Sequence, residues 1–166
     1  MRILVVDDHP LMRDGIVSMV ESEPDMTVVA QASNGLEAIE QFERHRPDIT
    51  LMDLQMGQMD GVTAIESICR AHPGARILVL TTYKGDAQAV RALQAGACGY
   101  LLKSMIRKEL VDALRAAHRG RKQIVPEVAV EIGLHALDEP LSARDLEVLK
   151  EGSGGRAKKP VVTPEA

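Results

Sequence analysis

The side chains best suited to take part in a reaction stand at or just after the ends of short apolar runs. They are Asp7, Asp8, Asp53, Thr81 and Lys103. The runs read ILVV, ITLM, ILVL and YLL. If they are parallel strands of one sheet, their carboxyl ends meet at the edge where such sheets bind ligands. The sequence would then bring three carboxylates, a hydroxyl and an ammonium group to one place.

Three carboxylates in a shallow pocket repel one another, by ~4 kcal/mol for two unit charges at ~4 Å and an effective dielectric of ~20. A hard divalent cation offsets this repulsion. Mg²⁺ suits the site because it prefers oxygen ligands and leaves water positions open for a phosphoryl group. One carboxylate can then attack phosphorus, while the cation and Lys103 neutralise the charge that develops. Thr81 can donate a hydrogen bond to a phosphoryl oxygen. The pattern therefore predicts Mg²⁺-dependent phosphoryl chemistry.

The elements that must position these residues alternate along the chain. Apolar runs too short for helices occur at Ile3–Val6, Met26–Ala30, Ile49–Met52, Ile77–Leu80 and Tyr100–Leu102. Three are nearly continuous, which is typical of strands covered on both faces. Amphipathic helices are predicted over Pro10–Ser22, Leu36–His45, Val62–Ala71, Ala87–Ala95 and Ile106–His118. The alternation predicts an α/β fold of about 120 residues, a doubly wound five-stranded parallel sheet with helices on both faces. The second run ends in no comparable polar residue, as expected of an edge strand.

The composition limits the classes of protein that fit. The chain has 166 residues, enough for one domain with an appendage, and 45% of them are hydrophobic. A net charge of −4 gives no general attraction to nucleic acid or anionic membranes. No apolar run reaches the roughly 20 residues that span a bilayer, and the start of the chain does not read as a signal peptide. Cys69 and Cys98 stand in no disulfide or zinc pattern. We therefore expect a cytoplasmic protein.

Together with the sequence around them, these five residues resemble the receiver domain of bacterial two-component response regulators. The resemblance rests on VVDDHP, LMDLQM…MDG, VLTTY and AGACGYLLK followed by an amphipathic helix, and covers about Met1–Arg119. It implies the flavodoxin-like receiver fold, with Asp53 as the phospho-acceptor and Lys103 as the partner of the phosphoryl group. Asp8 would bind Mg²⁺ directly and Asp7 through water, and Asp53 would also be one of the metal-site residues.

The resemblance implies further roles. The backbone carbonyl of Gln55 would be another ligand of Mg²⁺. Thr81 and Tyr100 would form a switch that reports phosphorylation to the far helices. A sensor histidine kinase or a small acyl-phosphate-type donor would supply the phosphoryl group, and a homodimer or contact with another protein would be the output. Such a chain accepts and slowly hydrolyses its own aspartyl phosphate and is not a general catalyst.

HPLMRDG and GACGYLLKS further resemble the NarL/FixJ branch, whose members carry a C-terminal LuxR-type helix-turn-helix that binds DNA. We predict a receiver domain over 1–120, a linker with helical character over 121–140, a remnant of the first helix-turn-helix helix over 141–151, and a disordered tail over 152–166. From Leu141 only 26 of the 166 residues remain. The helices that read the major groove have no residues left, so this chain alone is not expected to bind a DNA site.

The chain departs from the family beside the acceptor, where Gly57 and Gln58 stand in place of the usual proline and its neighbour. Glycine adds backbone freedom where proline would fix φ. We expect a looser metal-binding loop with altered phosphorylation or dephosphorylation rates. His9 is within reach of the metal site but reads as a polar residue at a helix start.

Two other functions stay open. A metal-dependent phosphatase with an aspartyl nucleophile also uses an α/β sheet, but such enzymes resemble an Asp-x-Asp pattern after the first strand. Here Asp7 and Asp8 are adjacent, and the best nucleophile follows the third run. The second alternative is a pseudo-receiver that binds partners without phosphorylation, which the change at Gly57 slightly favours.

Overall fold

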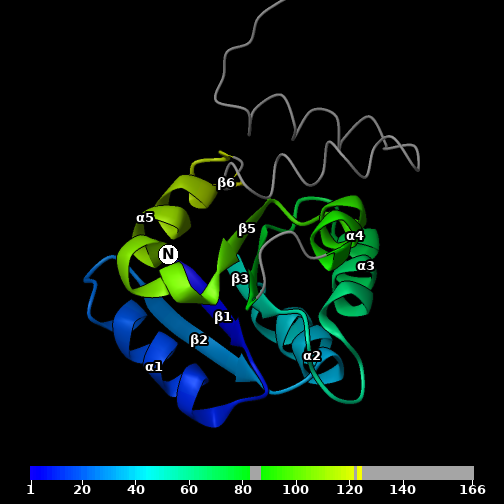
Figure 1. The fold of residues 1–166 in the computed structure, drawn as a ribbon, viewed down its shortest axis with the longest axis horizontal. Helices are drawn as coiled ribbons and strands as arrows, with labels where there is room; N and C mark the ends of the chain where they lie inside the picture. Colours follow the sequence, from blue (N-terminus) through cyan, green and yellow to red (C-terminus); the bar gives the residue numbers. More distant parts are fainter. Residues whose placement is uncertain (83–86, 122, 125–166) are drawn as a thin grey trace, which may run out of the picture.

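A computed structural model describes residues 1–82, 87–121 and 123–124 of the chain (Figure 1). The described residues form one sheet with the strand order β2-β1-β3-β4-β5-β6, and every neighbouring pair is parallel. The strands are β1 (Arg2–Val6), β2 (Thr27–Ala32), β3 (Ile49–Asp53), β4 (Ile77–Thr81), β5 (Gly99–Leu102) and β6 (Gln123–Ile124).

Helices cover both faces of the sheet. They are α1 (Pro10–Glu21), α2 (Gly35–His45), α3 (Gly61–Ala71), α4 (Ala87–Ala95) and α5 (Ile106–His118), and the 3₁₀ turn η1 (Lys103–Met105) precedes α5. Figure 1 shows α1 and α5 on one side of the sheet and α2, α3 and α4 on the other. The predicted doubly wound α/β architecture is therefore confirmed.

The central strands read as continuous apolar runs because both of their faces are buried. In β1, Leu4 and Val6 pack in the core beneath α2, α3 and α4, whereas Ile3 and Val5 pack in the core beneath α1 and α5. Successive side chains of a strand point to opposite faces, so a strand covered on both sides is apolar along most of its length. All five residues of β3 and of β4 are likewise buried.

The ends of some elements differ from the prediction, at helices that begin with a capping side chain and at the edge strand of the sheet. The helices α2 and α3 each begin one residue earlier than predicted, because the side chains of Asn34 and Asp60 cap them by accepting hydrogen bonds from the N–H groups of Glu37 and Thr63. The edge strand β2 extends two residues beyond the prediction, through the exposed Gln31 to the buried Ala32.

The structure adds a strand that the sequence did not predict. Residues 123 and 124, assigned to the linker, pair with β5 and make the sheet six-stranded. The linker helix, the helix-turn-helix remnant and the tail predicted beyond residue 124 lie outside the described residues. Within the described part, no helix is both long and apolar enough to span a membrane.

Candidate functional site

The carboxyl ends of the central strands bring the predicted residues together. Parallel pairing places the end of β1 beside β3, β3 beside β4, and β4 beside β5. Asp7 therefore follows β1 at the same rim where Asp53 ends β3, and Lys103 follows directly after β5. Thr81, the last residue of β4, pairs in register with Leu102. The sheet order alone thus assembles residues that are far apart in the sequence.

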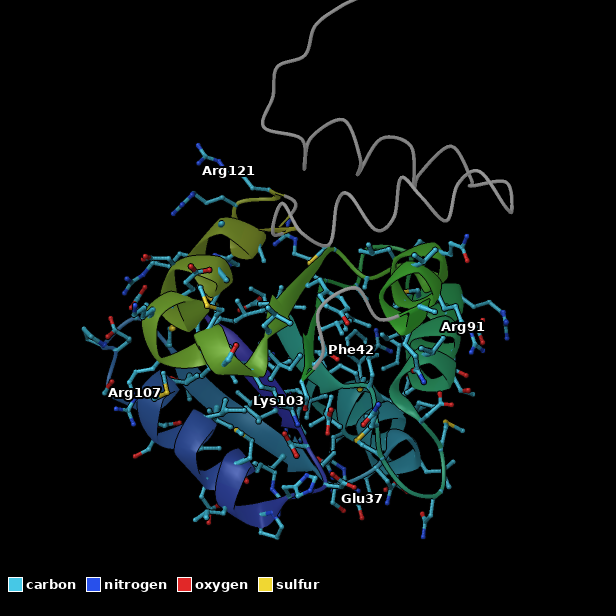
Figure 2. All side chains as sticks on the ribbon, in the orientation of Figure 1. Glu37, Phe42, Arg91, Lys103, Arg107 and Arg121 are labelled. Atoms are coloured by element: carbon cyan, nitrogen blue, oxygen red, sulfur yellow. The ribbon has the colours of Figure 1, made fainter. Side chains whose placement is uncertain are left out.

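One ammonium group faces two buried carboxylates. The Nζ atom of Lys103 lies 3.2 Å from Oδ2 of Asp7 and 3.3 Å from Oδ2 of Asp53. The Lys103 side chain is 12% exposed, and those of Asp7 and Asp53 are 0% and 4% exposed. Figure 2 shows Lys103 beside the carboxyl ends of the strands. Both Oδ2 atoms are buried, and Lys103 lies at ion-pair distance from each of them.

The local charge balance is negative. Burial raises the pKa of the Asp53 carboxyl above its ordinary value; Lys103 opposes this effect, and the nearby charge of Asp7 adds to it. A buried carboxylate is costly unless a countercharge compensates it. One ammonium cannot compensate both carboxylates, so the site favours an additional cation.

The turn after β1 completes the acidic cluster. Asp8, with a side chain 33% exposed, places Oδ1 2.9 Å from Nδ1 of His9. The backbone N–H of His9 donates a hydrogen bond to Oδ1 of Asp7 over 2.8 Å. Donor atoms of Asp7, Asp8, His9 and Asp53 all lie within 4.8 Å of one another. Three carboxylates gathered around a single ammonium group are a suitable donor set for Mg²⁺, so the site fits the ion that the sequence predicted.

The loop after β3 is held by a close backbone approach. Gly61 donates its N–H to the carbonyl oxygen of Leu54 over 3.0 Å. A Cβ atom at Gly61 would lie 2.3 Å from the carbonyl oxygen of Asp53, so only glycine fits there. The N–H of Gln55 approaches Oδ1 of Asp53 at 3.4 Å. Gln58 has a φ of 61°, a left-handed conformation beside Gly57 that a non-glycine residue adopts infrequently.

The predicted switch residues are buried parts of the strands. Thr81 is 2% exposed at the end of β4. Tyr100 is 1% exposed and packs in the core beneath α3 and α4, where its position in β5 pairs with Val79. The structure therefore brings together Asp7, Asp8, Asp53 and Lys103 directly, with Gln55 adjoining them and Thr81 and Tyr100 on neighbouring strands.

Two residues near the site were not predicted to belong to it. His9, interpreted as a polar residue at a helix start, lies against both Asp7 and Asp8. Arg13 donates from Nη1 to the backbone carbonyl of Asp7 over 2.7 Å. The sequence signal for His9 was its adjacency to the paired aspartates. Arg13 follows Pro10 by less than one helical turn, a spacing that gave no chemical signal.

Comparison with known proteins defines the class. Residues 3–115 match the family model of the response regulator receiver domain, and the chain belongs to this family. The resemblance seen in the sequence is thus confirmed. Phosphorylation-driven switching is the function of this class, and the phosphatase and pseudo-receiver alternatives are not favoured.

The similar proteins include transcription regulators. The chain is 36% identical over 168 residues to the transcriptional regulatory protein LiaR of Bacillus subtilis, covering 96% of this chain and 80% of LiaR. It is 38% identical over 153 residues to the response regulator protein VraR of Staphylococcus aureus, covering 89% of this chain and 73% of VraR.

Solved structures agree with this assignment. A LuxR-family two-component response regulator from Aurantimonas sp. matches with a TM-score of 0.76 and 39% identity, covering 82% of this chain and 97% of that one. The receiver domain of the putative response regulator NarL from Mycobacterium tuberculosis matches with a TM-score of 0.68 and 36% identity, covering 72% of this chain and 97% of that one.

Proposed function

We propose that Asp53 accepts a phosphoryl group from a sensor histidine kinase in an Mg²⁺-dependent reaction, and that the adduct switches the receiver between two conformations. The observation that carries this proposal is the Lys103 ammonium within 3.3 Å of both Asp7 and Asp53 at the carboxyl rim of the sheet. A phosphoryl group on Asp53 would enter a site whose charges are already arranged around that carboxyl.

Each residue has a role in this reaction. An oxygen of Asp53 attacks phosphorus, and the bond from phosphorus to the donor's leaving group breaks. Lys103 stabilises the charge on the transferred group. Asp7 and Asp8, with the Gln55 carbonyl, hold Mg²⁺, which supplies positive charge near the phosphoryl oxygens when bound.

The output follows from a two-state equilibrium. Thr81 would donate its hydroxyl hydrogen to a phosphoryl oxygen, and Tyr100 would repack in the core beneath α3 and α4. Phosphorylation shifts the equilibrium only as far as it stabilises one state over the other. Relatives named as transcriptional regulators support an output in transcription. In this chain, dimerisation or contact with another protein would be that output.

The remaining assignments complete the proposal. Residues 1–120 would form the receiver, followed by a linker over 121–140, a helix-turn-helix remnant over 141–151 and a tail over 152–166. The chain would act in the cytoplasm. It would hydrolyse its own aspartyl phosphate slowly and would not turn over other phosphate esters.

Intact-mass measurement tests the proposal. Incubation with acetyl phosphate and Mg²⁺ should add one phosphoryl group to the full chain, and Asp53→Asn should abolish the adduct. Asp112→Asn, on the exposed face of α5, is a matched control that should retain it. Absence of an adduct with every donor would contradict the proposal, as would rapid turnover of general phosphate esters. Gel filtration with and without beryllofluoride tests whether the modification changes assembly.

A further inference from the structure

His9 occupies the N-cap position of α1 but does not cap the helix. Its backbone is extended, with φ −94° and ψ 109°, and its side chain makes no hydrogen bond to the first turn. A polar residue at this position ordinarily accepts a hydrogen bond from a free N–H group of the helix. The His9 ring instead turns toward the acidic cluster, with Nδ1 2.9 Å from Oδ1 of Asp8 and 3.4 Å from Oδ1 of Asp7.

The contact between His9 and Asp8 does not have hydrogen-bond geometry. Although Nδ1 lies 2.9 Å from Oδ1 of Asp8, this oxygen is buried and has no hydrogen-bond partner among the described residues. The Nδ1 atom is therefore close to the oxygen without being directed at it. Two donor atoms held side by side in this way are arranged like neighbouring ligands of one ion.

The distances agree with octahedral coordination. Neighbouring ligands in an octahedron with bonds of ~2.1 Å are ~3.0 Å apart, and opposite ligands are ~4.2 Å apart. The separations of Nδ1 from the Asp8 and Asp7 oxygens, 2.9 and 3.4 Å, are close to the first value. All four donors lie within 4.8 Å of one another, so a small contraction would complete the set.

We propose that Nδ1 of His9 is a ligand of the divalent ion and that the site therefore prefers a first-row transition ion such as Mn²⁺ over Mg²⁺. Imidazole is a ligand of first-row transition ions, whereas Mg²⁺ binds through oxygen and gains little from a nearby ring. Mn²⁺ is the transition ion that also suits the carboxylate ligands of this site. The inference rests on the proposed function, because it assumes that the same carboxylates hold the ion. The ring is accessible to rearrange, since the His9 side chain is 72% exposed.

Pulsed electron paramagnetic resonance of the full chain loaded with Mn²⁺ tests the inference directly. The wild-type protein should show coupling between Mn²⁺ and a nitrogen nucleus, and His9→Ala should lose it. Removing the ligand should weaken Mn²⁺ binding by about 10-fold or more, with Mg²⁺ binding, measured by displacement of Mn²⁺, unchanged. His118→Ala, which removes an exposed imidazole at the end of α5, should change neither affinity.

The outcomes separate this inference from the proposed function. If wild-type Mn²⁺ shows no nitrogen coupling, or if His9→Ala leaves the ratio of Mn²⁺ to Mg²⁺ affinity unchanged, the His9 inference is overturned and the oxygen-ligand site stands. If neither ion binds the wild-type chain, the metal-dependent function fails as well. Because the nitrogen coupling is measured on the wild-type protein, a folding defect in the variant cannot mask the result.

Discussion

Replacing Lys103 with methionine should show how much of the stability of the receiver depends on this one ammonium group. The change leaves Asp7 and Asp53 buried, with donor oxygens no more than 4.8 Å apart. At an effective dielectric of ~20, two unit charges at that distance repel by ~3.5 kcal/mol. Breaking a buried ion pair by removing one partner costs about 3–5 kcal/mol. We therefore expect the free energy of unfolding at neutral pH, without divalent ions, to fall by about 3–5 kcal/mol.

The pH dependence identifies the cause. Lys103 lowers the pKa of Asp53 while burial raises it, so Lys103→Met raises that pKa further above its ordinary value of 3.8. A carboxyl with a raised pKa in the folded state binds its proton more tightly there, and its ionisation costs stability as the pH rises. The deficit of the variant should be small below pH ~4 and should grow toward neutral pH.

Urea denaturation followed by circular dichroism measures this deficit at acidic and neutral pH. Lys108→Met, on the exposed face of α5, is the matched control and should change stability little. Adding Mg²⁺ should restore more stability to Lys103→Met than to the wild-type chain, because the ion replaces the missing positive charge. A deficit under about 1 kcal/mol at neutral pH, the size of an exposed ion pair, would refute the reasoning. An equal deficit at both pH values would refute it too.

Further perturbations test the loops and the surface. Gly61→Ala should lower the free energy of unfolding by about 1–3 kcal/mol, because the added Cβ would meet a backbone oxygen at 2.3 Å. Gly15→Ala in α1, where a Cβ meets nothing within 4 Å, should instead raise the free energy of unfolding by ~0.5–1 kcal/mol. Urea unfolding measures both changes, and equal effects of the two variants would contradict the packing argument. Arg115 lowers the pKa of Asp25 through a hydrogen bond, so the stability that it gives is present at neutral pH and lost as the pH falls through the lowered pKa. The melting temperatures of wild type and Arg115→Ala should therefore converge in acid; a constant difference would argue against this pair. Gly57→Pro, at a position with open space for a Cβ, should alter the rate at which the phosphoryl adduct forms from acetyl phosphate or decays. Equal rates in the variant and the wild-type chain would contradict the hypothesis that Gly57 loosens this loop.

The hydrophobic pattern predicted the fold because a strand that is buried on both faces appears in the sequence as a continuous apolar run. The buried strands β3 and β4 were read from continuous apolar residues. The pattern was less reliable on partly covered surfaces. Leu36, an apolar residue at the start of the predicted amphipathic helix Leu36–His45, is 54% exposed, whereas Ala38 and Phe42 are buried. The start of the helix at Gly35, fixed by its cap, determines which side chains face the core.

Weak elements also escaped prediction. The edge strand β2 includes the exposed polar residue Gln31, which interrupts the apolar run. The strand β6 is two residues long, too short to leave a periodic signal. Its pairing with β5 depends on where α5 returns the chain, which is a tertiary effect.

The sequence by itself determined which side chains follow the strands, and the right-handed parallel topology then required them to share one rim. Only the tertiary structure decided how these side chains meet. Lys103 bridges two buried acids rather than contacting Asp53 alone, and His9 turns from its helix toward Asp8. Sequence spacing fixes the order of groups along the backbone, but rotamers, burial and countercharges depend on neighbours brought from distant parts of the chain.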